Sequence, residues 1–205
     1  IERHGAGKSI KVIFLGDYID RGFHSKEVID TLLKMDMPQA ELVFLAGNHE
    51  DMLLRFLDDP AEGQLWLGVG GLATLASYGV FLGDDSSVED LVDASVELAH
   101  KLPDAHLAFL KNLPTLDAVG GYRFVHAGVR PGVALEEQDR ADLLGIRREF
   151  TQSGFDFGFC VVHGHTGVRA PEQHKNRIAI DTGAFATGVL TAAVFEQSDV
   201  SFITT

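Results

Sequence analysis

The chain is poor in cysteine, in positive charge and in long apolar runs. Cys160 is the one cysteine among 205 residues, so no disulfide can form within the chain and a reducing, cytoplasmic location is expected. No secretion signal is visible and no apolar run reaches the roughly 18 residues that span a bilayer, so we expect no membrane partner. Seventeen Lys and Arg against 30 Asp and Glu give a net charge of -13. That balance argues against a nucleic-acid partner, which would require a basic face.

The rest of the composition is that of an ordinary folded protein, with 45% hydrophobic and 23% charged residues. One sizeable core fits this length, so we expect a single domain over residues 1–205. Apolar spacing predicts an α/β fold in which two packed mixed sheets are flanked by helices. The predicted helices are a segment from Ser25 toward Pro38 and segments 51–57, 87–102 and 104–113. The predicted strands are 12–15, 42–45, 115–119, 122–125, 160–162, 177–180, 189–195 and 201–204.

Three short segments carry most of the chemical information, namely Gly16–Gly22 (GDYIDRG), Gly47–Glu50 (GNHE) and His163–Thr166 (HGHT). Each directly follows an apolar run that is typical of a buried strand. Ligands of α/β sheets bind outside the carboxyl ends of strands, so these polar side chains are expected to meet at one rim. Asp, Asn and His delivered to one rim indicate a metal-dependent hydrolase.

The first of these loops offers a metal ligand and a phosphate ligand. Asp17 follows Gly16 at a strand end, and its carboxylate suits a divalent cation. Asp20 and Arg21 come three and four residues later, in a loop that can fold back over the same site. A guanidinium beside a metal binds phosphate oxygens in bidentate fashion. Taken alone, this string is equally consistent with a solvated turn that carries an Asp–Arg surface pair.

Amide and imidazole groups follow the other strands. Asn48 can ligate a metal through its neutral amide oxygen, while His49 points elsewhere and is available as a proton donor. The alternative is a turn with an exposed histidine. His126 also follows a strand. His163 and His165 frame Gly164, and we expect one metal to receive only one of these two directly. A single histidine of this kind is more often structural, but together with Asp17 and Asn48 the set favours a metal site.

The remaining histidines are expected to be exposed on loops or helix faces. They are His4, His24, His100, His106 and His174. Cys160, Met52 and Trp66 are expected to serve packing rather than function.

The order of these motifs resembles the calcineurin-like metallophosphoesterases, and most of all the PPP-type serine/threonine protein phosphatases of the small bacterial and phage branch. The segments that carry the likeness are Gly16–Gly22, Gly47–Glu50, His126–Gly128 and Gly164–Thr166, with weaker likeness over Val125–Gly132, Leu143–Phe150 and Arg177–Gly188. The resemblance implies a double sheet flanked by helices, an αββα sandwich with two divalent metal ions at its rim. Manganese is the first expectation, with iron, zinc, nickel and cobalt as alternatives.

The resemblance also implies a role for each matched residue. Asp17 would bridge the two metals, and Asn48, His126 and His165 would complete the shell of one. Asn48 would also bind the substrate phosphate.

For the chemistry itself, the resemblance implies that His49 is the general acid, paired with Asp20. Arg21 and Arg147 would bind the substrate phosphate.

Two departures from the family pattern affect these expectations. Similar bacterial proteins have Trp where this chain has Gly145, which would leave Arg147 less firmly held. The family's Asp-x-His motif, which supplies the other metal, is absent from the chain. We expect that motif on a strand upstream of Ile1 and beside the strand at 12–15, with Ile1–Arg3 as the tail of a helix. As written, one metal shell is nearly complete and the other has only the Asp17 bridge, so this chain is expected to be impaired.

The sequence therefore predicts a phosphomonoesterase that acts on phosphoserine or phosphothreonine in proteins, with a metal-activated water and no covalent intermediate. One alternative is a hydrolase of small phosphoesters or dinucleoside polyphosphates on the same fold. Another is an inactive regulatory protein that binds metal or phosphate. The sequence does not distinguish the physiological substrate among these hypotheses, and it does not specify the oligomeric state.

Overall fold

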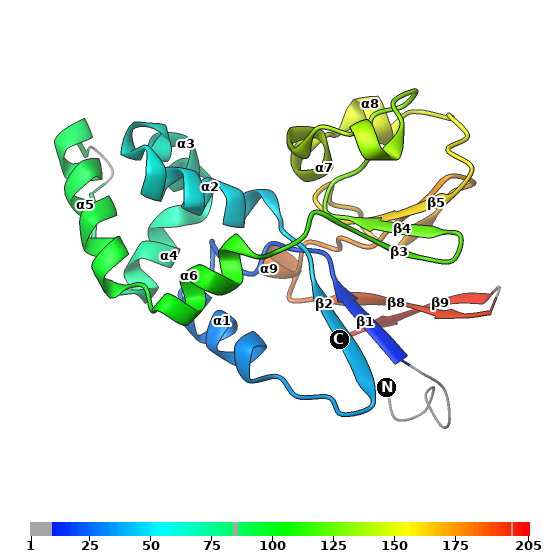
Figure 1. Ribbon diagram of the computed structural model, residues 1–205, viewed down its shortest axis with the longest axis horizontal. Helices are drawn as coiled ribbons and strands as arrows, with labels where there is room; N and C mark the ends of the chain where they lie inside the picture. Colours follow the sequence, from blue (N-terminus) through cyan, green and yellow to red (C-terminus); the bar gives the residue numbers. More distant parts are fainter. Residues whose placement is uncertain (1–9, 84–85, 198) are drawn as a thin grey trace. The chain divides into compact units, whose positions relative to one another are not determined.

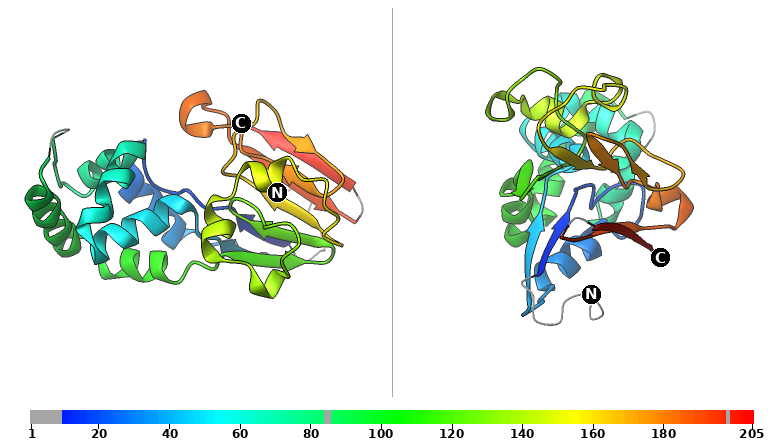
Figure 2. Two further views of the ribbon diagram at one scale, coloured as in Figure 1. Left: turned by 90° about the horizontal axis from the view of Figure 1, so that it is seen from above. Right: turned by 90° about the vertical axis from the view of Figure 1, so that its right-hand side faces the viewer.

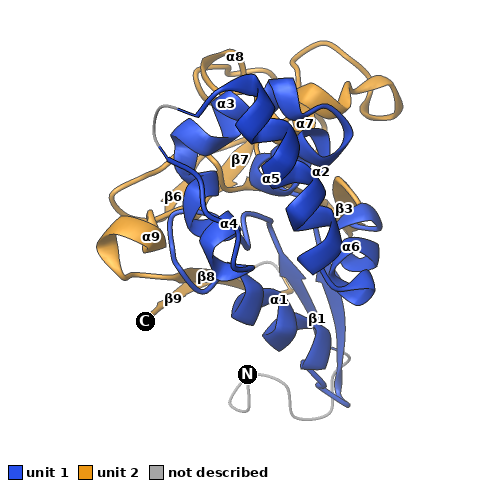
Figure 3. Ribbon diagram, turned by 90° about the vertical axis from the view of Figure 1, so that its left-hand side faces the viewer, with its two compact units in different colours: residues 1–113 blue, residues 114–205 orange. Residues whose placement is uncertain are grey.

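The computed structural model describes residues 10–83, 86–197 and 199–205 (Figure 1). The helix tail expected at 1–3 and His4 lie outside the described residues. The chain divides into two compact units, Ile1–Leu113 and Pro114–Thr205, which are coloured separately in Figure 3. The single domain expected from the sequence remains a prediction. Among the described residues, no helix combines the length and apolarity that crossing a bilayer requires.

Unit 1 begins with a βαβ arrangement. Strand β1 (Ile10–Phe14) pairs in parallel with β2 (Ala40–Phe44), with Val12 opposite Leu42, and helix α1 (Ser25–Lys34) forms the crossover that parallel pairing requires. Within the described residues β1 pairs with β2 and with no other strand. The helical segments that follow are α2 (Asn48–Asp58), η1 (Pro60–Glu62), α3 (Gly63–Trp66), η2 (Leu67–Gly71), α4 (Leu72–Ser77), α5 (Val88–Lys101) and α6 (Asp104–Lys111).

Aromatic and aliphatic side chains join the helices and the strands of unit 1. Phe44 of β2 lies with its ring centroid 4.8 Å from that of Phe14 and 5.5 Å from that of Phe109, so α6 covers the strand pair. The helical part has its own core, whose fully buried members include Ile29, Leu53, Phe56, Trp66, Leu75, Leu91 and Leu98. This packing holds the ends of β1 and β2, and the loops that follow them, against a helical framework.

Helix α2 begins at Asn48, three residues before the predicted start at 51. The reason is that Gly47 is extended at the N-cap and its backbone N–H donates to the Glu50 side chain at 2.8 Å. This contact satisfies one of the unpaired donors at a helix start. Asn48 and His49 are therefore first-turn helical residues rather than loop residues.

Unit 2 contains a five-stranded sheet and a hairpin. The sheet order is β3 (Leu116–Val119), β4 (Tyr122–Val125), β5 (Cys160–His163), β7 (Arg177–Ala179) and β6 (Glu172–Gln173), with β4, β5 and β7 parallel and both edges antiparallel. Strands β8 (Thr191–Glu196) and β9 (Asp199–Thr204) form the hairpin. The short helices are η3 (Leu135–Glu137), α7 (Arg140–Gly145), α8 (Arg148–Thr151) and α9 (Ala184–Thr187).

The sheet of unit 2 is covered on both faces (Figure 1, Figure 2). Tyr122 and Phe124 contact Phe195 of β8, with ring centroids 4.6 and 5.7 Å apart. On the other face Val125 packs in one cluster with Leu143 and Phe150 of the helices. This alternation is what a strand buried on both sides requires. The prediction of an α/β fold with packed sheets flanked by helices is confirmed.

Candidate active site

The predicted site residues fall in both units, and each group is described within its own unit. In unit 1, the loop after β1 has an unusual backbone. Asp17, Asp20 and Arg21 have φ angles of 61°, 78° and 65°. Non-glycine residues seldom adopt this left-handed region, and such strain clusters at functional sites. The surrounding contacts therefore have to hold the loop in place.

Glu50 supplies two of those contacts, to the backbones of Asp17 and Tyr18. Its buried carboxylate accepts hydrogen bonds from the backbone N–H groups of Asp17 at 3.0 Å, Tyr18 at 2.7 Å and Gly47 at 2.8 Å. Burial and the neighbouring Asp17 raise the pKa of the Glu50 carboxyl. A side chain at position 47 would collide with the Asp17 carboxylate, so only glycine allows this close approach. Glu50 thus fastens the loop that carries Asp17 to the start of α2.

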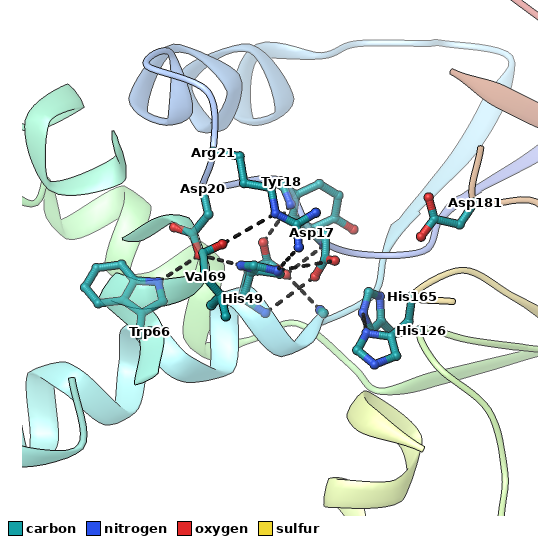
Figure 4. Close-up of polar contacts among 12 residues, drawn as sticks. Asp17, Tyr18, Asp20, Arg21, His49, Trp66, Val69, His126, His165 and Asp181 are labelled. Carbon is teal, nitrogen blue, oxygen red and sulfur yellow. Dashed lines mark hydrogen bonds and ion pairs between the residues drawn. The ribbon is translucent and has the colours of Figure 1, made fainter. Parts of the chain in front are cut away.

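A buried pair, His49 and Asp20, forms the chemical centre of unit 1 (Figure 4). His49 Nδ1 lies 2.5 Å from Asp20 Oδ2, and only 3% of His49 is exposed. With Nδ1–H donating to the carboxylate, the other nitrogen, Nε2, faces Arg21 Nη2 at 3.3 Å and Asp17 Oδ2 at 3.9 Å. This arrangement can hold a proton on Nε2 and deliver it to a substrate oxygen.

The environment of His49 favours the protonated form. Burial lowers the pKa of His49, but the hydrogen bond to Asp20 and the negative charge of Asp17 outweigh burial and the nearby Arg21. The pKa of His49 therefore lies above its ordinary value of 6.5. A protonated imidazole near neutral pH is what a general acid needs.

Two further side chains hold Asp20 and were not predicted from the sequence. Trp66 Nε1 donates to Asp20 Oδ2 at 2.8 Å, and Thr74 Oγ1 donates to Asp20 Oδ1 at 2.6 Å. Trp66 is buried and packs against Phe56 as expected, and its indole N–H in addition binds the Asp20 carboxylate. The one sequence signal was that a buried tryptophan usually needs an acceptor for its N–H.

In unit 2, the side chains of His126 and His165 lie next to each other. His126 follows β4 and His165 lies two residues beyond β5, and His126 Nε2 is 3.2 Å from His165 Nδ1. Two ligands about 2.0–2.1 Å from one tetrahedral or octahedral cation lie about 3 Å apart, so this pair fits a metal shell. His165 has φ of 60°, another left-handed residue at a strand end.

Arg147 accompanies this histidine pair. Its Nη1 donates to the backbone carbonyl of His165 at 3.2 Å. At Gly145, where similar proteins carry Trp, a Cβ would meet no atom within 4 Å, so the surface beside Arg147 is open. The structure brings Arg147 to the His165 backbone, without an aromatic neighbour at 145.

His163 belongs to the core of unit 2 rather than to the His126–His165 pair. It is buried, its Nδ1–H donates to the Gly164 carbonyl at 3.0 Å, and its ring lies 5.0 Å from that of Phe150. Burial lowers the pKa of His163 to about 4. His163 and His165 therefore have different surroundings because His165 has left the strand with φ of 60°, whereas residues two apart in an extended strand would share a face.

The structure groups the predicted residues by unit. Asp17, Asp20, Arg21 and His49 contact one another in unit 1, and half-buried Asn48 begins α2 beside His49. In unit 2 the corresponding group is His126, His165 and Arg147. Their individual catalytic and ligand roles remain predictions.

One further expectation, that His106 is exposed, is wrong. His106 is buried, and its Nδ1 lies 2.8 Å from the Tyr78 hydroxyl. Helix α6 turns the His106 side chain inward, where the Tyr78 hydroxyl provides a hydrogen-bond partner for the imidazole.

Comparisons with known proteins agree with this geometry. A model of the calcineurin-like phosphoesterase family matches residues 3–181. The asymmetrical bis(5'-nucleosyl)-tetraphosphatase PrpE of Anoxybacillus flavithermus is 26% identical, with 92% of this chain and 77% of the relative covered. The enzyme of the same name from Halalkalibacterium halodurans is 28% identical, with 90% and 74% covered. A crystal structure described as a candidate diadenosine tetraphosphatase matches with a TM-score of 0.60 at 18% identity, covering 98% of this chain and 84% of that chain, which supports the fold.

Proposed function

The chain belongs to the calcineurin-like phosphoesterase family, and we propose that it is a metal-dependent hydrolase of dinucleoside polyphosphates. Family membership supports phosphoester hydrolysis. The finer assignment rests on relatives named as asymmetrical bis(5'-nucleosyl)-tetraphosphatases, which align over nine-tenths of the chain. An asymmetrical cleavage splits a tetraphosphate into a nucleoside monophosphate and a nucleoside triphosphate. The substrate would be a flexible polyanion that carries a nucleoside at each end.

The observation that carries this proposal is the His49–Asp20 pair beside Arg21. The Arg21 guanidinium would bind the nonbridging oxygens of the phosphate under attack and neutralise the charge that develops on them. His49 would donate the proton on Nε2 to the bridging oxygen that leaves with the triphosphate. Asp20 would keep the imidazole in the tautomer that presents Nε2. Water adds to phosphorus as the P–O–P bond breaks, so the products together contain one added water.

We also propose the ligand set that the sequence predicts for one cation, Asp17 and Asn48 from unit 1 with His126 and His165 from unit 2. The donor chemistry fits, because carboxylate, amide and imidazole groups suit manganese, iron or zinc. A second ion, sharing Asp17, remains a prediction. When bound, divalent cations supply Lewis acidity toward phosphoryl oxygens and lower the pKa of water.

The protein phosphatase activity predicted from the sequence stays a second candidate. The form of the Gly16–Gly22 loop favours it, since that sequence resembles protein phosphatases. The relatives favour the small-molecule alternative. A regulatory protein without turnover is the third hypothesis, and an intact His49–Asp20–Arg21 group argues against it.

Turnover by the purified chain with manganese separates these candidates. Diadenosine tetraphosphate, a phosphoserine peptide and p-nitrophenyl phosphate would be compared, with products separated by ion-exchange chromatography. We expect the tetraphosphate to have the highest kcat/KM and to give AMP and ATP in equal amounts. A higher kcat/KM on the phosphopeptide would favour the protein phosphatase, and no turnover of any substrate would favour the regulatory protein.

A further inference from the structure

Asp20 is held by more hydrogen bonds than pairing with His49 requires. Its carboxylate is fully buried, and its Oδ2 accepts from both His49 Nδ1 and Trp66 Nε1. Its Oδ1 accepts from Thr74 Oγ1, and the same hydroxyl accepts from the Asp20 backbone N–H at 2.9 Å. A buried carboxylate is costly unless it is well hydrogen-bonded. Each of its two oxygens therefore has a donor outside the dyad.

The two extra donors are themselves fixed. Trp66 is 1% exposed, and the centroid of its ring lies 5.1 Å from the centroid of the Phe56 ring. A side chain at Gly71 would collide with the indole, so the backbone closes over its other side. Thr74 is fully buried in α4 and hydrogen-bonds Ser25 Oγ at 2.9 Å. The packing of α3 and α4 thereby sets the positions of the indole N–H and the threonine hydroxyl.

We propose that Trp66 and Thr74 are positioning residues that fix the plane of the Asp20 carboxylate and, through it, the direction in which His49 presents Nε2. Figure 4 shows Asp20 between the indole and the imidazole, with both rings aimed at the carboxylate. Fixing Oδ1 and Oδ2 separately removes rotation of the carboxylate, which a single contact to His49 would leave possible. The packing of α3 and α4 then sets the orientation of the His49 ring through Asp20.

This role rests on the proposed function of His49 as a proton donor. Misplacement of a catalytic group by about 1 Å can cost on the order of 100-fold in rate. A partial loss of alignment should therefore slow protonation of the leaving group by about tenfold, with little effect on binding of the phosphate by Arg21. A residue that matters only for packing would instead slow all substrates equally.

Two substitutions test the proposal with different risks to folding. Trp66→Phe keeps an aromatic ring against Phe56 and removes the N–H. Thr74→Val keeps the shape of the side chain and removes the hydroxyl. The control is Phe56→Leu, which loosens the same packing cluster and leaves both donors in place. All variants would be measured with manganese on a series of aryl and alkyl phosphates whose leaving groups differ in pKa.

We expect Trp66→Phe and Thr74→Val to lower kcat about tenfold on the poorest leaving groups and less than about twofold on p-nitrophenyl phosphate, with KM unchanged. Phe56→Leu should show no dependence on the leaving group. Combined with His49→Asn, neither variant should cause a further loss, because the proton donor they align is gone. Parallel losses on every substrate, or additive losses with His49→Asn, would overturn the positioning role.

A second measurement does not depend on turnover. Trp66 is the chain's one tryptophan, so a single indole N–H resonance reports on the contact. In the metal-free protein we expect that resonance to exchange slowly with solvent and to move upfield in Asp20→Ala. A resonance that is unaffected would overturn the contact. A wild-type protein that hydrolyses no phosphate ester would overturn the proposed function and this role together, whereas an active protein with parallel losses would overturn this role alone.

Discussion

The Glu50 carboxylate accepts a hydrogen bond from the backbone N–H of Asp17 at 3.0 Å. Through this bond the third residue beyond β1 is tied to the first turn of α2, 33 positions later in the chain. The bond stabilises a loop whose left-handed residues would otherwise relax.

The substitution Glu50→Gln should therefore destabilise unit 1. An amide places an N–H₂ group among backbone donors and leaves at least one buried donor without an acceptor. We expect a loss of about 2–3 kcal/mol in the free energy of unfolding, measured by urea titration. Glu62→Gln, at an exposed position, is the control and should stay within about 0.5 kcal/mol of wild type. Equal stability of the two variants would contradict the anchoring role.

His49→Asn should slow hydrolysis of alkyl phosphates more than hydrolysis of p-nitrophenyl phosphate. Nitrophenolate leaves well without a proton, whereas an alkoxide needs one, and general acid catalysis contributes about 10²–10⁴-fold. Manganese affinity should change little, because His49 is assigned as an acid and not as a ligand. Steady-state kinetics and calorimetric titration would check both statements, and equal losses on both substrates or loss of the metal would refute the assignment.

Arg21→Ala should weaken binding of every phosphate substrate alike. The guanidinium would contact the phosphoryl group that all of them share, and a hydrogen bond to a charged group is worth about 1.5–3 kcal/mol. We expect kcat/KM to fall by about 10–100-fold on both alkyl and aryl substrates. Arg55→Ala removes an exposed arginine paired with Asp51 on α2 and should leave the kinetics unchanged. A loss that depends on the leaving group would point to a role in proton transfer instead.

His126→Ala should weaken manganese binding. Loss of an outer-shell partner of a ligand costs about 10–100-fold in metal affinity, and loss of the ligand itself should exceed that. Calorimetry on protein treated with chelator would measure the change, and activity lost with chelator should return on addition of manganese. The matched control is His174→Ala, a histidine paired with Glu172 outside the predicted site. Unchanged affinity in His126→Ala would remove this residue from the ligand set.

The stability of the protein should fall in acid partly because of His163. Burial lowers the pKa of His163 to about 4, against 6.5 ordinarily. Between these two pH values the unfolded chain therefore binds a proton at this histidine and the folded protein does not. The contribution of neutral His163 is fully present above about pH 6.5 and is lost as the pH falls toward 4, a change of about 3 kcal/mol. His163→Gln should flatten this part of the profile in urea titrations at a series of pH values. A profile as steep as that of wild type would assign the acid sensitivity to other groups.

The strand ends and the groups that follow them could be predicted from the sequence because both depend on neighbours in the chain. The runs before Asp17 and Asn48 are apolar, and the strands β1 and β2 lie within a residue or two of their predicted limits. The support around Asp20 could not be predicted in this way. Trp66 lies 46 positions from Asp20, within an apolar segment, and no local spacing distinguishes its N–H contact from packing.

The burial of His106 was hidden for a similar reason. It lies on the amphipathic helix α6, where a histidine is compatible with either face. Its partner Tyr78 is 28 positions away, and only the packing of the helices brings the two side chains together. The hydrogen bond to Tyr78 offsets the cost of burying His106. Neither the composition nor the periodicity of the sequence indicates this hydrogen bond.

Gly70 makes the Arg21 loop sensitive to the handedness of one residue. Its φ is 125°, its carbonyl accepts from the Arg21 backbone N–H at 3.1 Å, and the Cβ of an L-residue would lie 2.7 Å from Arg21 Cγ. A D-residue prefers positive φ and places its Cβ on the opposite side of the backbone. In a semisynthetic protein, D-alanine at position 70 should leave Arg21 in place, whereas L-alanine should displace it. The chain therefore requires a particular backbone handedness at position 70, which the sequence indicates only by the absence of a side chain.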